Sequence, residues 1–341
     1  MDALNIERAR GLMEGIAVGN LLGIRMEGWP QPLVANAYPG GVREIDAASG
    51  YPDDDDLAQA IIVAEAAIKG PLDPHALALD FWQWGEANGL GMGGLTRDVL
   101  SLFGGDAPQR LAARRRAGEV RQPDGGMSVE EAARRAWDGG RAGNGALMRC
   151  WPLAIRWCGH DEKLVAESVT SSVATHWDTR CGWSCALANL AAAGALRDKR
   201  IAADELLWMA EDGMRAAMPN LEQYGHRPKP PSSVVEAVQH AWESDLSDIA
   251  FDGPDKGFTL LTLQAALISY WRAEDFESGL SRVIEAGGDT DTNGAAVGAM
   301  LGARFGRSGI PGRWRKRVFE IRLGRIPMQW YADRLIDALE Q

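Results

Sequence analysis

Long apolar runs, cysteine pairs at metal-binding spacing and an excess of positive charge are all missing from this sequence. The 341 residues carry a formal net charge of −11, so general binding to nucleic acid is not expected. No apolar run approaches the roughly 20 residues that a membrane-spanning helix requires. The segment 1–10 is polar and does not resemble a signal peptide. These absences predict a soluble cytoplasmic protein that binds neither membranes nor nucleic acid.

Cysteine is scarce and carries no recognisable pattern. Cys150, Cys158, Cys181 and Cys185 include no CxxC pair, so neither a zinc site nor a dithiol redox site is indicated. Cys181 and Cys185 stand four residues apart in a predicted helix and therefore share one of its faces. We expect reduced, buried cysteines of the kind that cytosolic proteins carry.

The alternating pattern of β-strands is also absent, and apolar residues recur at helical spacing instead. This predicts an all-α protein of about a dozen helices, folded as a single compact domain over residues 1–341. Two stretches, 104–145 and 224–233, interrupt the pattern and are expected to be surface excursions. The expected helices are 6–22, 57–69, 75–88, 164–175, 178–198, 202–218, 233–243, 259–272, 276–286, 293–305, 312–323 and one that ends at 336–339.

One string near the C-terminus stands out among what is present. Gly287 and Gly288 lead into Asp289-Thr290-Asp291-Thr292, and a run of small residues typical of a tightly packed helix follows. Carboxylate and hydroxyl oxygens are the ligands that hard divalent cations prefer. Capping of the helix N-terminus is the alternative reading, since Asp and Thr are both good caps.

A second acidic string lies about two hundred residues earlier, at the four aspartates 53–56. Neighbouring unit charges about 5 Å apart repel by roughly 0.8 kcal/mol in water, and helix capping accounts for only one or two carboxylates. A solvated acidic cap remains the alternative. Neither string contains His or Cys, which favours magnesium or manganese over zinc. The two strings together predict one metal site built from both ends of the chain.

Three further strings contain candidate site residues. Gly143-Asn144-Gly145 is expected to form a turn at the start of a helix, where free backbone N–H groups suit a phosphate or carboxylate. The alternative is an ordinary loop and helix start with no ligand. His176 lies between two predicted helices and is either a base or a capping or core histidine. Glu27 follows the end of the first helix, where Gly23 suits a C-cap, and by itself would be a surface glutamate.

Taken in order, these strings resemble the ADP-ribosylglycohydrolase family. The resemblance covers residues 8 to 310 and rests on five motifs. They are Gly19-Asn20-x-x-Gly23-x-x-x-Glu27, the aspartates 53–56, Gly143-Asn144-Gly145-Ala146-x-Met148-Arg149-x-x-Pro152-Leu153, Thr175-His176, and Gly287-Gly288-Asp289-Thr290-Asp291-Thr292.

The resemblance implies an all-α fold around a central two-metal site, which usually holds two Mg²⁺ and sometimes Mn²⁺. Matched by motif, the metal ligands are Asp53, Asp54, Asp55, Asp289, Asp291 and Thr292. Asp56 belongs to the group if the register of the first motif shifts by one residue.

The resemblance also implies an activity. Family members release ADP-ribose from a modified protein or small molecule: a metal-held water attacks the anomeric carbon, and a carboxylate acts as base. Carried over by motif, the catalytic residues are Glu27, Asp54, Asp55 and Asp289. The substrate-binding residues are Asn144, Gly145, His176, Gly288 and Phe258, the last as an adenine-stacking or pocket-lining ring. The family is often monomeric.

Several positions depart from the family pattern. Asn20 stands where the family usually has Asp, and aspartates replace both threonines of the second motif. The arginine-rich stretch 110–121 matches no family motif. These departures leave two alternatives open: hydrolysis of another riboside or nucleotide-like compound by the same fold, or a protein that binds ADP-ribose without catalysis.

Overall fold

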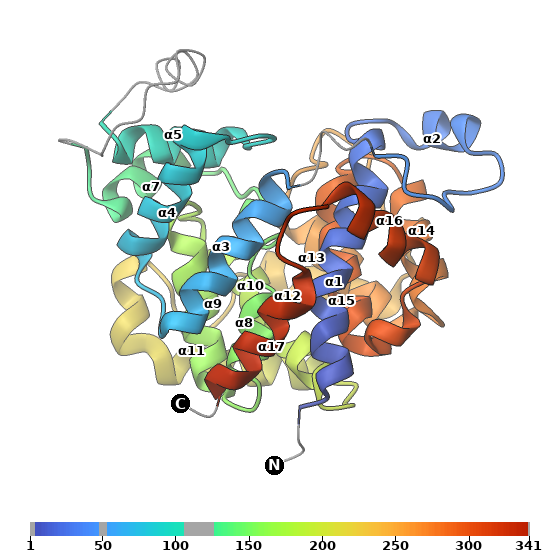
Figure 1. The fold of residues 1–341 in the computed structure, drawn as a ribbon. Coiled ribbons are helices and arrows are strands. Elements are labelled where there is room, and N and C mark those ends of the chain that lie inside the picture. Colours follow the sequence, from blue (N-terminus) through green and yellow to red (C-terminus); the bar gives the residue numbers. More distant parts are fainter. Residues whose placement is uncertain (1–3, 48–52, 106–125, 340–341) are drawn as a thin grey trace.

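The computed structural model describes residues 4–47, 53–105 and 126–339 (Figure 1). Every regular element in these ranges is helical, apart from two isolated β-bridges, which confirms the all-α prediction. The α-helices are α1 (Ile6–Gly23), α2 (Gln31–Ala37), α3 (Asp55–Lys69), α4 (Pro74–Ala87), α5 (Gly94–Phe103), α7 (Val129–Trp137), α8 (Pro152–Arg156), α9 (Asp161–Val173), α10 (Thr179–Leu196), α11 (Ala203–Leu221), α12 (Ser232–Glu243), α13 (Thr259–Arg272), α14 (Phe276–Glu285), α15 (Thr290–Gly309), α16 (Gly312–Ile321) and α17 (Met328–Leu339).

Every helix expected from periodicity has a counterpart, but α2, α5, α7 and α8 were not predicted. The helices α2 and α8 span only seven and five residues, too few to show a helical period. The stretch 104–145 was expected to be a surface excursion, yet it contains α7. The arginine-rich stretch 110–121 lies outside the described residues. Both acidic strings were expected at the start of a helix, and they lie there, since α3 begins at Asp55 and α15 begins at Thr290.

The helices α1 and α15, far apart in sequence, lie side by side with their backbones in contact (Figure 1). A Cβ atom on Gly15 would lie 2.1 Å from the carbonyl oxygen of Gly298, and one on Gly19 would lie 1.8 Å from that of Gly294. Only glycine permits this approach. The close-packed glycines recur every fourth residue at 11, 15, 19 and 23 in α1 and at 294, 298 and 302 in α15. The pairing brings the end of α1 to the start of α15.

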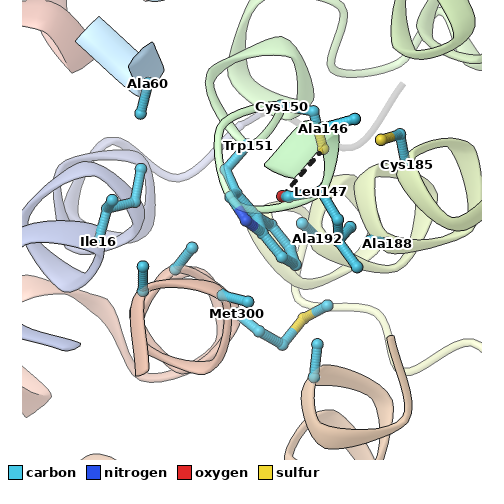
Figure 2. Close-up of a cluster of buried hydrophobic side chains, with 14 of the residues drawn as sticks. Ile16, Ala60, Ala146, Leu147, Cys150, Trp151, Cys185, Ala188, Ala192 and Met300 are labelled. Atoms are coloured by element: carbon cyan, nitrogen blue, oxygen red, sulfur yellow. Dashed lines mark hydrogen bonds between the residues drawn. The ribbon is translucent and has the colours of Figure 1, made fainter. Parts of the chain in front are cut away.

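A buried cluster around Trp151 packs the middle of the molecule together (Figure 2). Trp151 precedes α8 and is fully buried, as are Ile16 of α1, Ala60 of α3 and Met300 of α15. This core holds α1, α3 and α15 against one another. It therefore sets where the ends of α1 and the starts of α3 and α15 stand.

The cysteines are all unpaired, as expected, and three of the four are buried. Cys150 donates its thiol to the carbonyl of Leu147 at 3.5 Å within the cluster of Figure 2. Over the described residues, no helix is long and apolar enough to cross a membrane.

Candidate metal and substrate site

A cavity of about 510 Å³ opens where α1 ends and where α3 and α15 begin. Its walls come from the turn after α1, the loop before α5, the segment 140–148 and the loop before α13. Five carboxylates line it, namely Glu27, Asp55, Asp255, Asp289 and Asp291. The cavity therefore gathers residues from both ends of the chain, as the two acidic strings predicted.

The acidic string at the start of α3 is buried. Asp54, Asp55 and Asp56 are 3%, 9% and 1% exposed, and one carboxylate oxygen from each lies within 4.8 Å of the others. Two unit charges at that separation repel by about 3 kcal/mol at the effective dielectric of a protein interior. The solvated acidic cap, which was the alternative for this string, does not describe these side chains.

Hydrogen bonds from two other segments of the chain orient these carboxylates. The side-chain amide of Asn20 donates to Asp54 at 2.9 Å and to Asp56 at 3.3 Å. The backbone N–H of Gly93 donates to Asp55 at 3.3 Å. The buried Oδ1 atoms of Asp56 and Asn20 have no hydrogen-bond partner. Asn20 therefore joins the end of α1 to the acidic group, and two buried oxygens remain unsatisfied there.

The start of α15 supplies the other half of the site. The hydroxyl of Thr290 donates to the carbonyl of Gly23 at 2.8 Å, which ties α15 to the end of α1. Asp291 accepts from the backbone N–H of Thr292 at 2.9 Å. Asp289 accepts from the side-chain amide of Asn144 at 2.7 Å. These bonds hold Asp289 and Asp291 in the cavity wall.

Burial and mutual repulsion disfavour the ionised forms of these groups. Burial raises the pKa of Asp54 to about 6, and burial together with the charge of Asp54 raises the pKa of Asp55 to about 8. The pKa values of Asp56 and Asp291 lie well above the ordinary range, first because of burial and then because of neighbouring aspartates. Burial, followed by the charge of Asp289, also raises the pKa of Glu27. Opposite charge placed among these groups would restore the ionised forms.

The donor set fits hard divalent cations. It consists of carboxylate, amide and hydroxyl oxygens, without sulfur or imidazole at the acidic group itself. The unsatisfied Oδ1 atoms of Asp56 and Asn20 are further oxygens that lack a partner. Within the described residues, none of the six carboxylates (Glu27, Asp54, Asp55, Asp56, Asp289 and Asp291) forms an ion pair with Arg or Lys. Such a group requires positive charge that the described side chains do not supply.

Asp53 lies elsewhere. Its carboxylate accepts from Arg322 at 2.7 Å, just beyond the end of α16, and Arg325 lies 3.7 Å from its other oxygen. The group of close carboxylates runs from Asp54 to Asp56. The geometry therefore favours the register shifted by one residue, with Asp56 in place of Asp53.

Two single β-bridges connect the loops that form the walls. Pro30 pairs with Gly287, and Gly143 pairs with Phe258. Gly288 donates to Trp29 at 2.8 Å, and its φ of +81° belongs to the left-handed region that favours glycine. Gly288 was expected to touch substrate, but it bonds to neighbouring backbone and is not among the residues that line the cavity.

The other expected substrate-binding residues line the cavity. They are Asn144, Gly145, His176 and Phe258. His176 is 2% exposed, and burial followed by the charge of Arg149 keeps its pKa well below the ordinary value. One ring nitrogen of His176 lies 2.7 Å from the hydroxyl of Thr175. His176 is therefore a neutral imidazole packed against the 143–145 turn.

Sequence reasoning missed part of the lining. Arg141 lies just before the 143–145 turn and pairs with Asp98 at 2.6 Å, while Thr96 and Met148 line the wall nearby. The glycine-rich stretch 89–94 contributes Gly91, Gly93 and Gly94 to the cavity lining too. The density of glycine there was the available signal, because glycine lets backbone approach a ligand closely.

The helical fold and the acidic cavity belong to a chain whose family and relatives are hydrolases of glycosidic bonds. The model of the ADP-ribosylglycohydrolase family matches residues 1–341, and the chain belongs to that family. A solved structure titled ADP-ribosylglycohydrolase-related protein complex superposes with a TM-score of 0.67 at 25% identity, and the match covers 98% of each chain.

Two characterised relatives resemble the chain over most of its length. One is the ADP-ribosyl-[dinitrogen reductase] glycohydrolase of Rhodospirillum rubrum, 23% identical over 92% of this chain and 90% of the relative. Another is the ADP-ribosylarginine hydrolase of Pseudomonas putida, 27% identical over 92% of this chain and 74% of the relative.

Proposed function

We propose that this protein is a metal-dependent ADP-ribosyl hydrolase. It would cleave the N- or O-glycosidic bond between ADP-ribose and a modified protein side chain or small molecule. The observation that carries this proposal is that Glu27 and the aspartates 54–56, 289 and 291 converge at one cavity. Within the described residues, none of these six carboxylates forms an ion pair with Arg or Lys. Family membership and the names of the relatives support ADP-ribose as the group released.

Asp54, Asp55, Asp56, Asp289, Asp291 and Thr292 would hold two Mg²⁺ or Mn²⁺ ions. When bound, the cations supply positive charge that orients sugar hydroxyls and makes a water molecule more acidic. The protein keeps the ligand oxygens in place through Asn20, which donates to two of the aspartates, and through Asn144, which donates to Asp289.

Glu27 is the carboxylate best suited to act as base. It lines the cavity from the turn after α1, apart from the buried group at the start of α3. Burial and the charge of Asp289 raise its pKa, which brings it closer to neutral pH and makes it a stronger proton acceptor. As the water oxygen bonds to the anomeric carbon, a proton of that water would pass to Glu27. The electron pair of the breaking glycosidic bond would go to the acceptor group, which would then take up the proton from Glu27.

The rest of the cavity would bind ADP-ribose. The backbone at Asn144 and Gly145 forms the short helix η2 (Asn144–Ala146) beside the carboxylates. Arg141 is a cation in the lining, which suits the diphosphate. Phe258 carries a flat ring in the wall, with the guanidinium of Arg180 5.2 Å from its centroid. It is the candidate surface for stacking adenine.

The first test is release of free ADP-ribose from ADP-ribosylated arginine, serine and small-molecule substrates. We expect release with Mg²⁺ or Mn²⁺ and none with a chelator. The substrate from which ADP-ribose is released would also identify the acceptor group. A protein that binds Mg²⁺ but releases nothing from any of these substrates would contradict the proposal and favour another riboside or a non-catalytic role.

Asp291→Asn and Asp289→Asn each remove a carboxylate from the cavity wall. We expect turnover to fall at least about a hundredfold, because loss of even a residue that orients a metal ligand costs about 10- to 100-fold. Asp333→Asn is the matched control, since Asp333 pairs with Arg10 at the surface. Retained activity in either cavity variant, or equal loss in the control, would rule out the ligand assignment.

We further propose that the whole chain acts as one unit in the cytoplasm. The residues of the site extend from Asn20 to Thr292, so a segment shorter than 20–292 would lack part of the site. Four unpaired cysteines fit a reducing compartment.

A further inference from the structure

A second cavity lies at the opposite end of α1 and α15 from the carboxylates. It has a volume of about 290 Å³ and is lined by Arg8 of α1, Arg200 of the loop before α11, and Arg304 with Phe305 of α15. Arg304 is 14 residues beyond the start of α15, which places it about 21 Å along the helix from the acidic group. The two cavities are therefore separate.

Positive charge in this second cavity exceeds the negative charge around it. Among the described residues, Arg8 alone of the three arginines has a carboxylate partner, Asp198 at 2.6 Å. That carboxylate is 82% exposed, so water shares it. Arg200 and Arg304 form no ion pair in the described part of the chain. The three guanidiniums and this carboxylate have a formal charge of +2, and the ammonium group of Lys199 in the cavity lining adds a further positive charge.

Helix ends account for only part of this excess. Arg8 donates to the carbonyl of Ala195 at 2.6 Å, at the end of α10. Arg304 donates to Ser269 at 3.2 Å and Arg200 to Tyr270 at 3.5 Å, both near the end of α13. Each helix end carries about half a negative charge, so two ends offset about one of the two net charges of the arginines and Asp198. Close to one full positive charge is left without a partner.

The arginines are also held close together. Arg304 is half-buried, and burial together with repulsion from Arg200 and Arg8 lowers its pKa to about 10. A guanidinium has five N–H donors, and one hydrogen bond each is recorded for Arg200 and Arg304. Several donors on two repelling cations therefore remain for a ligand, in a protein whose net charge is −11.

We propose that this cavity binds a phosphate-bearing anion. Guanidiniums bind phosphate oxygens through paired, charge-assisted hydrogen bonds, and a cluster of arginines is the arrangement such anions require. The cavity is large enough for a diphosphate. Inorganic diphosphate and the diphosphate of a nucleotide share this chemistry. Phe305, whose ring centroid lies 4.6 Å from the guanidinium of Arg304, also lines the cavity and offers a ring surface to a nucleotide.

The test is a calorimetric titration of the full chain with pyrophosphate and, separately, with ADP. A chelator is present throughout, so that no divalent cation in the first cavity can hold the anion there. Chloride at equal ionic strength controls for general screening. We expect binding of pyrophosphate that is weakened about tenfold or more by Arg200→Met and by Arg304→Met. Arg215→Met is the matched control, because Arg215 is an exposed residue of α11 outside the cavity.

Arg200 is exposed, so its variant tests the cavity even if Arg304→Met disturbs the fold. If both probes bind, compete with each other and ADP binds more tightly, the ligand is a nucleotide. If only pyrophosphate binds, the ligand is the inorganic ion. No binding to the wild type, or equal binding by all variants, overturns the proposal. Loss of thermal stability in both variants with no anion effect would show that the arginines act only as caps of α10 and α13.

Discussion

Asn20 affects the charge and the hydrogen bonding of the acidic group at the start of α3. Its amide donates to Asp54 and Asp56, and its own Oδ1 is buried without a partner. The motif that it belongs to usually has Asp at this position, which would add a further carboxylate instead of two donated hydrogen bonds. The amide therefore lets the acidic group stay closely packed with one negative charge fewer.

We expect Asn20→Asp to lower stability strongly in chelator and much less with saturating Mg²⁺. Two hydrogen bonds to charged groups are worth about 1.5–3 kcal/mol each, and the new charge adds repulsion. Thermal unfolding in both conditions measures the difference. Asn189→Asp is the control, because Asn189 is buried elsewhere and donates to Ser168 and Cys150. Equal destabilisation of both variants with and without Mg²⁺ would contradict this role of Asn20.

His226 makes stability depend on pH. It is fully buried, and burial lowers its pKa to about 4, which the nearby Tyr224 backbone only partly offsets. The unfolded chain, with a histidine pKa of about 6.5, binds the proton first as pH falls. The contribution of His226 to stability is therefore present above pH 6.5 and is lost between pH 6.5 and 4, and this loss amounts to about 2 kcal/mol by pH 5.

Urea unfolding at pH 7 and pH 5 measures this loss, and we expect His226→Gln to remove most of the part due to this group. His75→Gln is the control, since His75 is exposed. An unchanged pH dependence in His226→Gln would show that other groups carry it.

At the scale of the element, the glycines of α1 and α15 decide where the site forms. Glycine in a helix costs about 1 kcal/mol relative to alanine, yet these helices carry one at every fourth position. The compensation is contact between two backbones, which places Asn20 and Gly23 of one helix beside Thr290 and Asp291 of the other. The packing of α1 against α15 therefore positions the residues proposed as metal ligands.

We expect Gly15→Ala to destabilise the protein by about 3 kcal/mol, the upper end of the range for overpacking. The new Cβ would lie 2.1 Å from a backbone oxygen, which no rotamer change relieves. Gly312→Ala is the control, because a Cβ at that position in α16 meets no atom closer than 3.9 Å. Chemical unfolding measures both variants. An unchanged or raised stability of Gly15→Ala would show that the helices separate without cost.

At the scale of the whole molecule, cation binding and folding are coupled. The acidic group exists only when α1, α3 and α15 are packed together, so a cation that binds it stabilises the folded state alone. At a hundred times the dissociation constant, this amounts to about 2.7 kcal/mol.

For a chain of this length, that stabilisation corresponds to a rise in melting temperature of about 4 °C. Calorimetric unfolding across a Mg²⁺ and Mn²⁺ titration measures it, with Ca²⁺ and Na⁺ at matched ionic strength as comparisons. A melting temperature that does not change with Mg²⁺ or Mn²⁺ would contradict the metal site.

Local chemistry determined much of this protein from the sequence alone. Helical periodicity predicted the all-α fold, because burial of one helix face repeats within a few residues. Runs of Asp and Gly marked the strings that meet in the cavity, because capping accounts for only one or two carboxylates at a helix start. The shortest helices escaped prediction since they show no period.

Only the tertiary structure decided which partners those residues have. Asp53 and Asp56 are alike in sequence, but Arg322, 269 residues away, pairs with Asp53 and leaves Asp56 in the acidic group. In the same way, neither the neutral state of His176 nor the meeting of Arg8, Arg200 and Arg304 follows from local sequence. Charge and protonation depend on neighbours in space, and the packing of helices that are far apart in the sequence determines those neighbours.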